Sequence, residues 1–413
     1  MQAVRASEAF DGEAFRAGGA TVFVEDGLIV GVEPFDHPLP QGCPVITYEG
    51  TLLPGLIDAH THLVGDSRMG ALDRVAGYSE EEIDAVVTEA LHDQLAAGVT
   101  TVRDLGDRGF CVVRRRDRQV TLGTAEPTIV ASGPPLTSEG GHCHFMGGEV
   151  AGPEEIERAV AERVEHGVDV VKVMASGGVN TPGSDVLLSQ FTTAELRLVV
   201  ERAHAAGLPV TAHAHATVAV EQALAAGVDG VEHCSCTTAE GMGRVNDETV
   251  SALARSGTVV CPTLGTDPHV LENPPPAIAA LMARLGTTPQ DFVRERGEFV
   301  ARLHRAGVRV ISGVDSGLNP GKRHGLLGLA VGELVTAGLG TAPAVATATS
   351  GAADGIGLGG RKGRLAAGYD ADVLAVDGDL ASDVTALLRP VAVLLRGESI
   401  ASVTGVPSAR LPG

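Results

Sequence analysis

The feature that most constrains the fold is a repeated alternation of helix-like and strand-like segments. Between residues 99 and 312, short runs of β-branched residues alternate with stretches rich in Ala and Glu. Four junctions carry an Ala-Gly pair, which is typical of a glycine that ends a helix just before a strand. These pairs are Ala97-Gly98, Ala206-Gly207, Ala226-Gly227 and Ala306-Gly307. Such alternation indicates βα units and a parallel sheet.

Eight units of this kind are predicted, each with one strand. The strands are expected at 51–57, 99–102, 128–131, 168–173, 209–212, 230–232, 258–261 and 308–312. Helices are expected over 80–97, 153–166, 192–206 and 289–306, and Thr192 with Glu195 forms a capping-box pattern. Eight consecutive βα units over roughly 300 residues are typical of a (β/α)8 TIM barrel rather than an open doubly wound sheet. The predicted fold class is therefore α/β.

The two chain ends show a different pattern. Short strand-like pieces at 20–24 and 27–32, and again at 372–376, 390–395 and 399–403, are separated by turn signals. Each end is too short to bury a core alone. We therefore expect a small β-sandwich built from residues 1–52 and 362–413, and the (β/α)8 barrel over 53–361. A proline-rich interruption at 266–288 is interpreted as a lid insertion over the barrel mouth.

Charge and composition exclude several classes of protein. The formal net charge is −21, which argues against nucleic-acid or anionic-membrane partners. Aromatic residues make up 3% with no Trp, so base-stacking platforms are not expected. Six cysteines without a disulfide-like framework, and no apolar segment in residues 1–10, predict a cytoplasmic protein with reduced thiols.

Histidines recur in pairs at the predicted strand ends. Three His-x-His pairs occur: His60/His62, His142/His144 and His213/His215. Residues i and i+2 of a strand share one face, so each pair can aim two imidazoles at one point. Neutral imidazole is the commonest protein ligand for zinc and related metals. Three pairs at barrel strand ends therefore predict a metal centre.

The segment 53–62, Leu-Pro-Gly-Leu-Ile-Asp-Ala-His-Thr-His, resembles the signature of the metal-dependent, urease-related amidohydrolase superfamily. Further landmarks follow in order: Lys172 at strand four, His213 at strand five, His233 at strand six and Asp315 after strand eight. The tail segment 363–372 resembles the segment through which the chain of these proteins returns from the barrel to the β-sandwich. A Gly-Gly-His element at 140–142 is similar to the imidazolonepropionase-like and prolidase-like branch.

The resemblance implies a site with two divalent metal ions, zinc, or else manganese, iron or cobalt. The ligands it implies are His60 and His62 with Asp315 for one ion, and His213 and His233 for the other. Lys172 would bridge both ions after its amine takes up CO2 as a carbamate. An unpaired ammonium inside the apolar run 168–174 would be costly, which also favours a ligand role for this lysine.

The implied reaction is hydrolysis of a C–N bond in a small-molecule substrate by a metal-bridging hydroxide, with Asp315 as general base. His142 is expected to stabilise the carbonyl oxygen. His215 stands where prolidase-like members often carry a tyrosine, so it is expected either to donate to the substrate or to have a structural role. His144 is expected either to pack among its neighbours or to support a residue of the site.

A substrate carboxylate could be recognised by a basic residue near the mouth, with Arg103, Arg108, Lys322 and Arg323 as unranked candidates. Asp104 is expected either to stabilise its loop or to contact the ligand. Glu232, next to His233 in the strand, is expected to face the helix layer.

Three functions are compatible with these patterns. The first is a hydrolase of dipeptides or N-acyl amino acids. The second is a cyclic amidine deaminase or imidazolone-type ring hydrolase, for which the lysine carbamate is not needed. The third is a non-catalytic scaffold, which typically loses the ligand residues that are all present here. Self-association into a homo-oligomer is expected from the resemblance.

Overall fold

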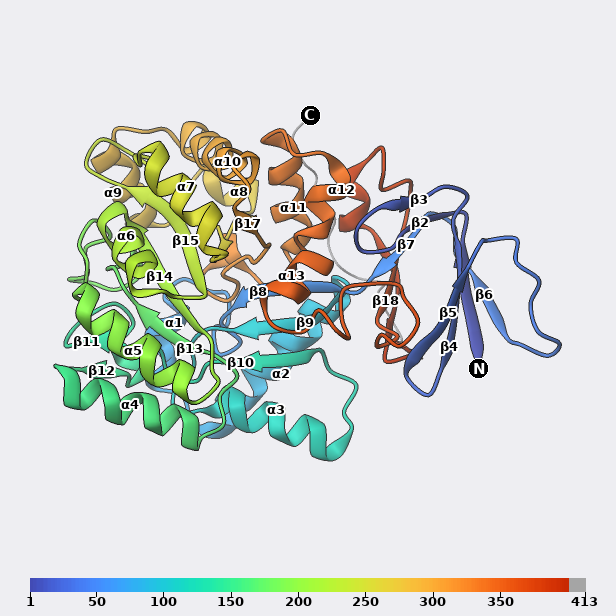
Figure 1. The fold of residues 1–413 in the computed structure, drawn as a ribbon, viewed down its shortest axis with the longest axis horizontal. Helices are drawn as coiled ribbons and strands as arrows, with labels where there is room; N and C mark the ends of the chain where they lie inside the picture. Colours follow the sequence, from blue (N-terminus) through green and yellow to red (C-terminus); the bar gives the residue numbers. More distant parts are fainter. Residues whose placement is uncertain (401–413) are drawn as a thin grey trace.

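The computed structural model describes residues 1–400 and shows a barrel with a β-sandwich at one side (Figure 1). Eight parallel strands form the barrel wall, in the orders β10-β9-β8 and β13-β14-β15-β16-β17. Their bounds are β8 Leu56–Thr61, β9 Val99–Asp104, β10 Thr128–Ala131, β13 Val171–Met174, β14 Val210–Ala216, β15 Gly230–Thr237, β16 Val259–Cys261 and β17 Arg309–Val310. The predicted (β/α)8 fold is confirmed.

Backbone hydrogen bonds join the two groups of strands into a ring. The Asp169 amide donates to the Ala131 carbonyl on one side, and the Ala59 amide donates to the Ser312 carbonyl on the other. Parallel bridges at Leu136–Val173 and Thr61–Ser316 extend both seams. The carboxyl ends of all eight strands therefore open on one rim, which is where TIM barrels place their sites.

Helices cover the outside of the barrel, and those over 153–165 and 289–305 each bury apolar residues along one side and carry charged residues along the other. The helices are α1 Ala71–Val75, α2 Glu80–Ala96, α3 Cys111–Leu122, α4 Pro153–Glu165, α5 Thr193–Ala205, α6 Thr217–Ala226, α7 Asp247–Ser256, α8 Pro268–Leu271, α9 Pro276–Leu285, α10 Pro289–Arg305, α11 Leu327–Thr336, α12 Thr341–Ala346 and α13 Ser350–Gly355. The expected capping box is present: the Thr192 hydroxyl accepts from the Glu195 amide and the Glu195 carboxylate accepts from the Thr192 amide. Two short strands, β11 Thr137–Ser138 and β12 Glu149–Val150, pair in the loop before α4.

Both chain ends contribute to the β-sandwich, as expected. The six-stranded sheet has the order β20-β19-β18-β7-β2-β3, and the four-stranded sheet has the order β5-β4-β1-β6. The strands are β1 Gln2–Ala6, β2 Glu8–Phe10, β3 Phe15–Arg16, β4 Ala20–Glu25, β5 Leu28–Glu33, β6 Val45–Thr47, β7 Thr51–Pro54, β18 Val373–Val376, β19 Pro390–Leu395 and β20 Glu398–Ser399. Of the strand expected at 399–403, residues 401–403 lie outside the described residues.

The first barrel strand differs from its prediction. The sequence predicts one strand over 51–57, whereas the structure divides this segment between β7 in the sandwich and β8 in the barrel. Gly55 lies at the change of sheet, and a Cβ there would come within 2.2 Å of the Thr100 hydroxyl oxygen. A continuous apolar run does not reveal such a change, because both strands are buried.

Residues 266–288 form two short helices, α8 and α9, rather than an irregular loop. Their apolar side chains line the cavity at the carboxyl-end rim, and Arg284 of α9 pairs with Asp185 across 2.8 Å. This arrangement places the insertion, hereafter the α8–α9 segment, in the wall of the site. Its role as a lid remains a prediction.

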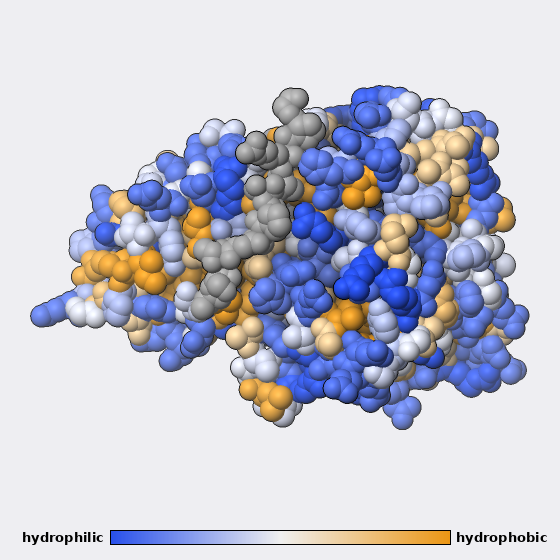
Figure 2. All heavy atoms as spheres, turned by 180° about the vertical axis from the view of Figure 1, so that it is seen from behind, coloured by the Kyte–Doolittle hydropathy of each residue, from blue (hydrophilic) through white to orange (hydrophobic). Residues whose placement is uncertain are grey.

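The surface seen from behind is largely hydrophilic, with hydrophobic side chains gathered at the end that carries the sandwich (Figure 2). Exposed apolar residues of β5 and β6 are Leu28, Val30, Val45 and Ile46. Among residues 1–400, no helix has the length and apolar character needed to cross a membrane. All six cysteines are free thiols, four of them buried.

Candidate metal centre and active site

The six predicted ligand residues converge on one cavity at the carboxyl-end rim. His60 lies in β8 and His62 directly after it, whereas His213 and His233 lie in β14 and β15. Lys172 lies in β13 and Asp315 follows β17. The chain brings them together because parallel strands of a barrel all end at the same rim.

His60, His62 and Asp315 form the first group of donors. The Nε2 atoms of both histidines lie 3.2 Å from the same oxygen, Oδ1 of Asp315. Burial alone would raise the pKa of Asp315, but the neighbouring imidazoles, His60 foremost, hold it well below its ordinary value. The carboxylate is therefore ionised and available to a cation.

The second group consists of His213, His215 and His233. One ring nitrogen from each lies within 4.8 Å of the others. The ring centroids of His213 and His233 are 4.5 Å apart, and the two groups meet where the His60 ring lies 5.2 Å from that of His233. Burial and neighbouring imidazoles lower the pKa of His213 and His233 well below the ordinary value. Neutral imidazole is the form that binds metals.

Hydrogen bonds on the outer ring nitrogens fix the orientation of the inner ones. His60 Nδ1 lies 2.8 Å from Glu232 Oε2, His62 Nδ1 lies 3.2 Å from the Gly106 carbonyl, and His233 Nδ1 lies 2.9 Å from the Thr263 hydroxyl. When Nδ1 donates to these acceptors, the Nε2 lone pair is free for a ligand. This is the arrangement that protein metal sites commonly use.

The orientation predicted for Glu232 is wrong. Its carboxylate lies inside the barrel, where it accepts from Arg103 at 2.9 Å and contacts His60. Strict alternation along a strand would send neighbours to opposite faces. His233 has a left-handed φ of 65°, which breaks the alternation at the end of β15 and lets both side chains face inward.

Lys172 lies in the wall of the same cavity and is 1% exposed. Its Nζ is buried and has no hydrogen-bond partner among the described residues. Burial lowers the pKa of this amine from its ordinary value. A buried amine with no hydrogen-bond partner is energetically costly, so its presence here needs a functional reason. Together with the histidines and Asp315, it makes a donor set that fits divalent metal ions.

His142 and His215 complete the histidine lining of the cavity. His142 Nδ1 contacts the Thr181 hydroxyl and His215 Nδ1 contacts the Ser235 hydroxyl, both at 2.9 Å. Burial lowers the pKa of each to about 3, so both rings are neutral. His144 begins a short 3-10 helix and does not line this cavity.

Asp58 was not singled out from the sequence, although it belongs to the signature segment. Its carboxylate accepts from the amides of His60 and Val314, from Gln94 Nε2 and from the Ser316 hydroxyl. It thereby joins β8 to the segment that carries Asp315. Asp104 has a loop role: its carboxylate accepts from the amides of Leu63 and Gly106.

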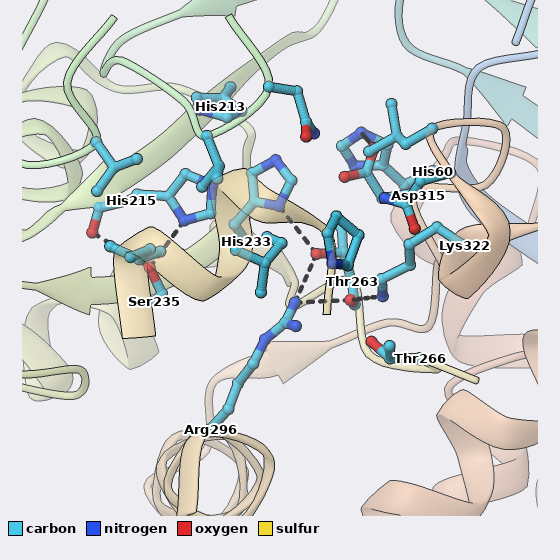
Figure 3. Close-up of a pocket in the computed structure, with 18 of the residues that line it drawn as sticks. His60, His213, His215, His233, Ser235, Thr263, Thr266, Arg296, Asp315 and Lys322 are labelled. Carbon is cyan, nitrogen blue, oxygen red and sulfur yellow. Dashed lines mark hydrogen bonds and ion pairs between the residues drawn. The ribbon is translucent and has the colours of Figure 1, made fainter. Parts of the chain in front are cut away.

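Of the four basic candidates, only Lys322 lines the cavity. Arg103 is bound to Glu232, Arg108 donates to the Ala76 carbonyl in a different hollow, and Arg323 lies 3.6 Å from Asp267. Sequence reasoning missed Arg296, which enters the cavity from α10 (Figure 3). A basic residue in an amphipathic helix resembles an ordinary solvent-facing charge, so the sequence carries no signal for it.

A (β/α)8 barrel with histidines, a carboxylate and a buried lysine at its open rim defines a class of metal-binding hydrolase. The comparisons identify the family: residues 51–403 match the amidohydrolase family, and the chain belongs to it. Ochratoxinase of Aspergillus niger is 27% identical over 371 residues, covering 83% of this chain and 73% of that protein. Imidazolonepropionase of Rubrobacter xylanophilus is 28% identical over 388 residues, covering 83% and 79%.

Among solved structures, a prolidase complexed with N-methylphosphonate-L-proline is similar to this chain. It has 25% identity and a TM-score of 0.81 over 97% of this chain and 99% of that one. Fold, family and cavity together make the protein a hydrolase that acts on C–N bonds.

Proposed function

We propose that the protein hydrolyses the amide or peptide C–N bond of a small substrate, of the dipeptide or N-acyl amino acid type. The observation that carries this proposal is the buried Lys172 amine without a partner, set among histidine donors. The similarity to a prolidase supports the dipeptide class.

Two divalent ions, zinc or else manganese, iron or cobalt, are part of the proposal. His60, His62 and Asp315 would hold one, and His213 and His233 the other, with a Lys172 carbamate between them. Carboxylation turns a cationic amine into an anionic oxygen ligand, and burial, which lowers the pKa of Lys172, favours the neutral amine that reacts with CO2. The chemistry that such ions supply is Lewis acidity toward a carbonyl and toward water.

The side chains of this protein then provide the proton transfers and the orientation. Asp315, held by His60 and His62, accepts the proton of the attacking water and passes it to the leaving nitrogen. His142, neutral and fixed by Thr181, can donate from Nε2 to the carbonyl oxygen as negative charge develops there. His215, fixed by Ser235, is the second donor facing the substrate.

A panel of dipeptides, N-acyl amino acids and cyclic imines tests the proposal. Hydrolysis of the first two classes with equal amounts of new amine and new carboxylate is expected. Release of ammonia without a new carboxylate would overturn it in favour of the second function, a cyclic amidine deaminase. Ring opening of a cyclic imine alone would favour an imidazolone-type hydrolase, which the similarity to imidazolonepropionase makes the second candidate.

A further inference from the structure

Two cations in the cavity wall have no acidic partner. Arg296 Nη2 donates to the Thr263 carbonyl at 2.6 Å, and Lys322 Nζ donates to the same oxygen at 2.8 Å. Figure 3 shows the two side chains approaching that carbonyl from opposite sides. Arg296 Nη2 also donates to the Thr263 hydroxyl at 2.8 Å, and that hydroxyl contacts His233. The cations therefore adjoin the metal centre.

No carboxylate among the described residues lies within ion-pair distance of either cation. Two acidic residues share the cavity wall with these cations: Asp315 lies against His60 and His62, and Glu333 Oε1 accepts from the Thr266 amide. Neighbouring basic residues do have acidic partners: Arg294 pairs with Asp291 and Glu298, and Arg323 lies against Asp267. In a chain with 52 acidic residues, two adjacent cations whose only acceptors among the described residues are carbonyl and hydroxyl oxygens are suited to receive an anion.

The donors that remain free suit a carboxylate. The hydrogen bonds of Arg296 within the protein all use Nη2, which leaves Nε and Nη1 without acceptors among the described residues. One free N–H group of Arg296 and the ammonium of Lys322 can each donate to one oxygen of a carboxylate. Burial and the charge of Arg296 lower the pKa of Lys322 to about 8, and a bound anion would relieve this repulsion.

The wall beyond the cations is apolar. This part of the wall consists of Val270, Leu271 and Ile278 of the α8–α9 segment and of Phe292 and Val293 of α10. A ligand that places a carboxylate on the cations would thus place an uncharged side chain against this surface. The cavity offers the metal centre on one side and the cations on the other.

We propose that Arg296 and Lys322 form a carboxylate subsite that restricts the enzyme to substrates whose leaving amino acid carries a free α-carboxylate and an apolar side chain. The inference rests on the proposed function, because the carboxylate that these residues bind belongs to the amino acid released when the C–N bond is cleaved. Arg296 and Lys322 thus determine which substrate binds and take no part in the hydrolytic steps.

Paired probes test the subsite. Leucyl-L-proline and leucyl-L-prolinamide serve as substrates, and L-proline and L-prolinamide serve as ligands in titration calorimetry. In the wild type, the carboxylate form of each pair is expected to be preferred. Lys322→Met should raise KM for leucyl-L-proline by about 10- to 100-fold with a much smaller change in kcat, and should abolish the preference. Arg296→Gln should act in the same direction.

The matched controls are Arg323→Gln and Arg294→Gln, which remove a neighbouring charge that already has a partner. Both should keep the wild-type preference, and all variants should keep the wild-type metal content. Because Arg296 also holds backbone carbonyls, Lys322→Met decides the outcome if Arg296→Gln does not fold.

The outcomes separate this inference from the proposed function. Carboxylate-selective binding that Lys322→Met removes, with no dipeptide hydrolysed, would support the subsite and overturn the function. Equal hydrolysis of the free and amidated dipeptides would overturn the subsite while the function stands. A preference that survives in Lys322→Met, or no carboxylate preference in either measurement, also overturns the subsite.

Discussion

At the scale of single residues, buried charges decide how the site is built. Glu232 accepts from Arg103 and contacts His60, and these partners, Arg103 foremost, lower the pKa of this carboxyl group despite its burial. It is a positioning residue, since it reaches the candidate metal centre only through the His60 ring. Glutamate at this place therefore fixes which nitrogen of His60 is free to bind.

Glu232→Gln should weaken metal binding by about 10- to 100-fold, as loss of such a supporting partner commonly does. Chelator competition measures this affinity. The variant also leaves Arg103 buried without its carboxylate, so the free energy of unfolding should fall. The double variant Arg103→Met/Glu232→Gln is the control: it should recover stability but not metal affinity. Wild-type affinity in Glu232→Gln would contradict the role given to Glu232.

A second buried carboxyl group makes stability depend on pH. Asp107 accepts from the amides of Phe110 and Val112 at the start of α3, and burial raises its pKa to about 6. The folded state thus binds a proton more tightly than the unfolded chain, whose aspartate titrates near 3.8. The contribution of this group to stability is greatest below pH 4 and is lost as the pH rises through 6.

Asp107→Asn keeps a side-chain acceptor and removes the titration. Urea unfolding at pH 4.5 and pH 7 should show that the wild type loses about 1–3 kcal/mol more than the variant between these pH values. Taking the difference between the two proteins cancels the titration of groups that do not interact with Asp107. Asp104 does interact, because the charge of Asp107 helps to raise the pKa of Asp104 to about 7, and its contribution has the same sign. An identical pH dependence in both proteins would contradict the raised pKa.

At the scale of elements, the loops after the strands set the position of the site side chains. The loop between β13 and α5 passes close to His142: a Cβ at Gly178 would lie 2.3 Å from His142 Nε2. Glycine is therefore required for close approach there. Gly183 in the same loop has a φ of 85° but no neighbour within 4 Å of a Cβ.

Gly178→Ala should displace the His142 ring and lower kcat by about 10- to 1000-fold, as loss of an oxyanion donor does, with metal content unchanged. Gly183→Ala is the control, expected to cost about 1 kcal/mol of stability through backbone strain and to leave kcat unchanged. Steady-state kinetics and thermal unfolding separate the two effects. Wild-type kcat in Gly178→Ala would contradict the role of His142.

The sequence predicted most elements because repeated glycine caps and β-branched runs are local signals. The helix predicted at 153–166 ends one residue earlier, and that predicted at 289–306 likewise, as α4 and α10. Two features depend on tertiary geometry and were missed. Gly55 ends one sheet and begins another, and the left-handed turn at His233 redirects Glu232.

The six residues of the proposed metal centre could be predicted from the sequence because they sit at strand ends in a recognisable order. Arg296 could not, because only the fold of α10 against the cavity distinguishes it from Arg294 two residues earlier. Among the four basic candidates, the choice of Lys322 likewise needed the position of Thr263.

At the scale of the whole molecule, barrel and sandwich share buried surface. Leu374 and Val376 of β18 belong to the same hydrophobic cluster as barrel and helix residues such as Leu56, Leu91 and Leu327. Leu374 is so close to the barrel that a Cβ at Gly98 would lie 2.7 Å from it. Barrel and sandwich should therefore unfold together.

Leu374→Ala should lower the free energy of unfolding by about 2–5 kcal/mol. Far-UV circular dichroism and metal release, followed in one thermal scan, should shift by the same amount. Val391→Ala on β19 is the control, because Val391 is 47% exposed and should change little. Metal release that stays at the wild-type temperature would show that the sandwich unfolds separately.

The proposed function requires two divalent metal ions, held by side chains from five strand ends. Metal analysis combined with anomalous diffraction of the purified protein tests this most directly. We expect two divalent ions per chain, one beside His60, His62 and Asp315 and one beside His213 and His233, with continuous density from Lys172 to both. A metal-free protein that hydrolyses its substrate at the full rate, or ions bound elsewhere with Lys172 unmodified, would contradict it.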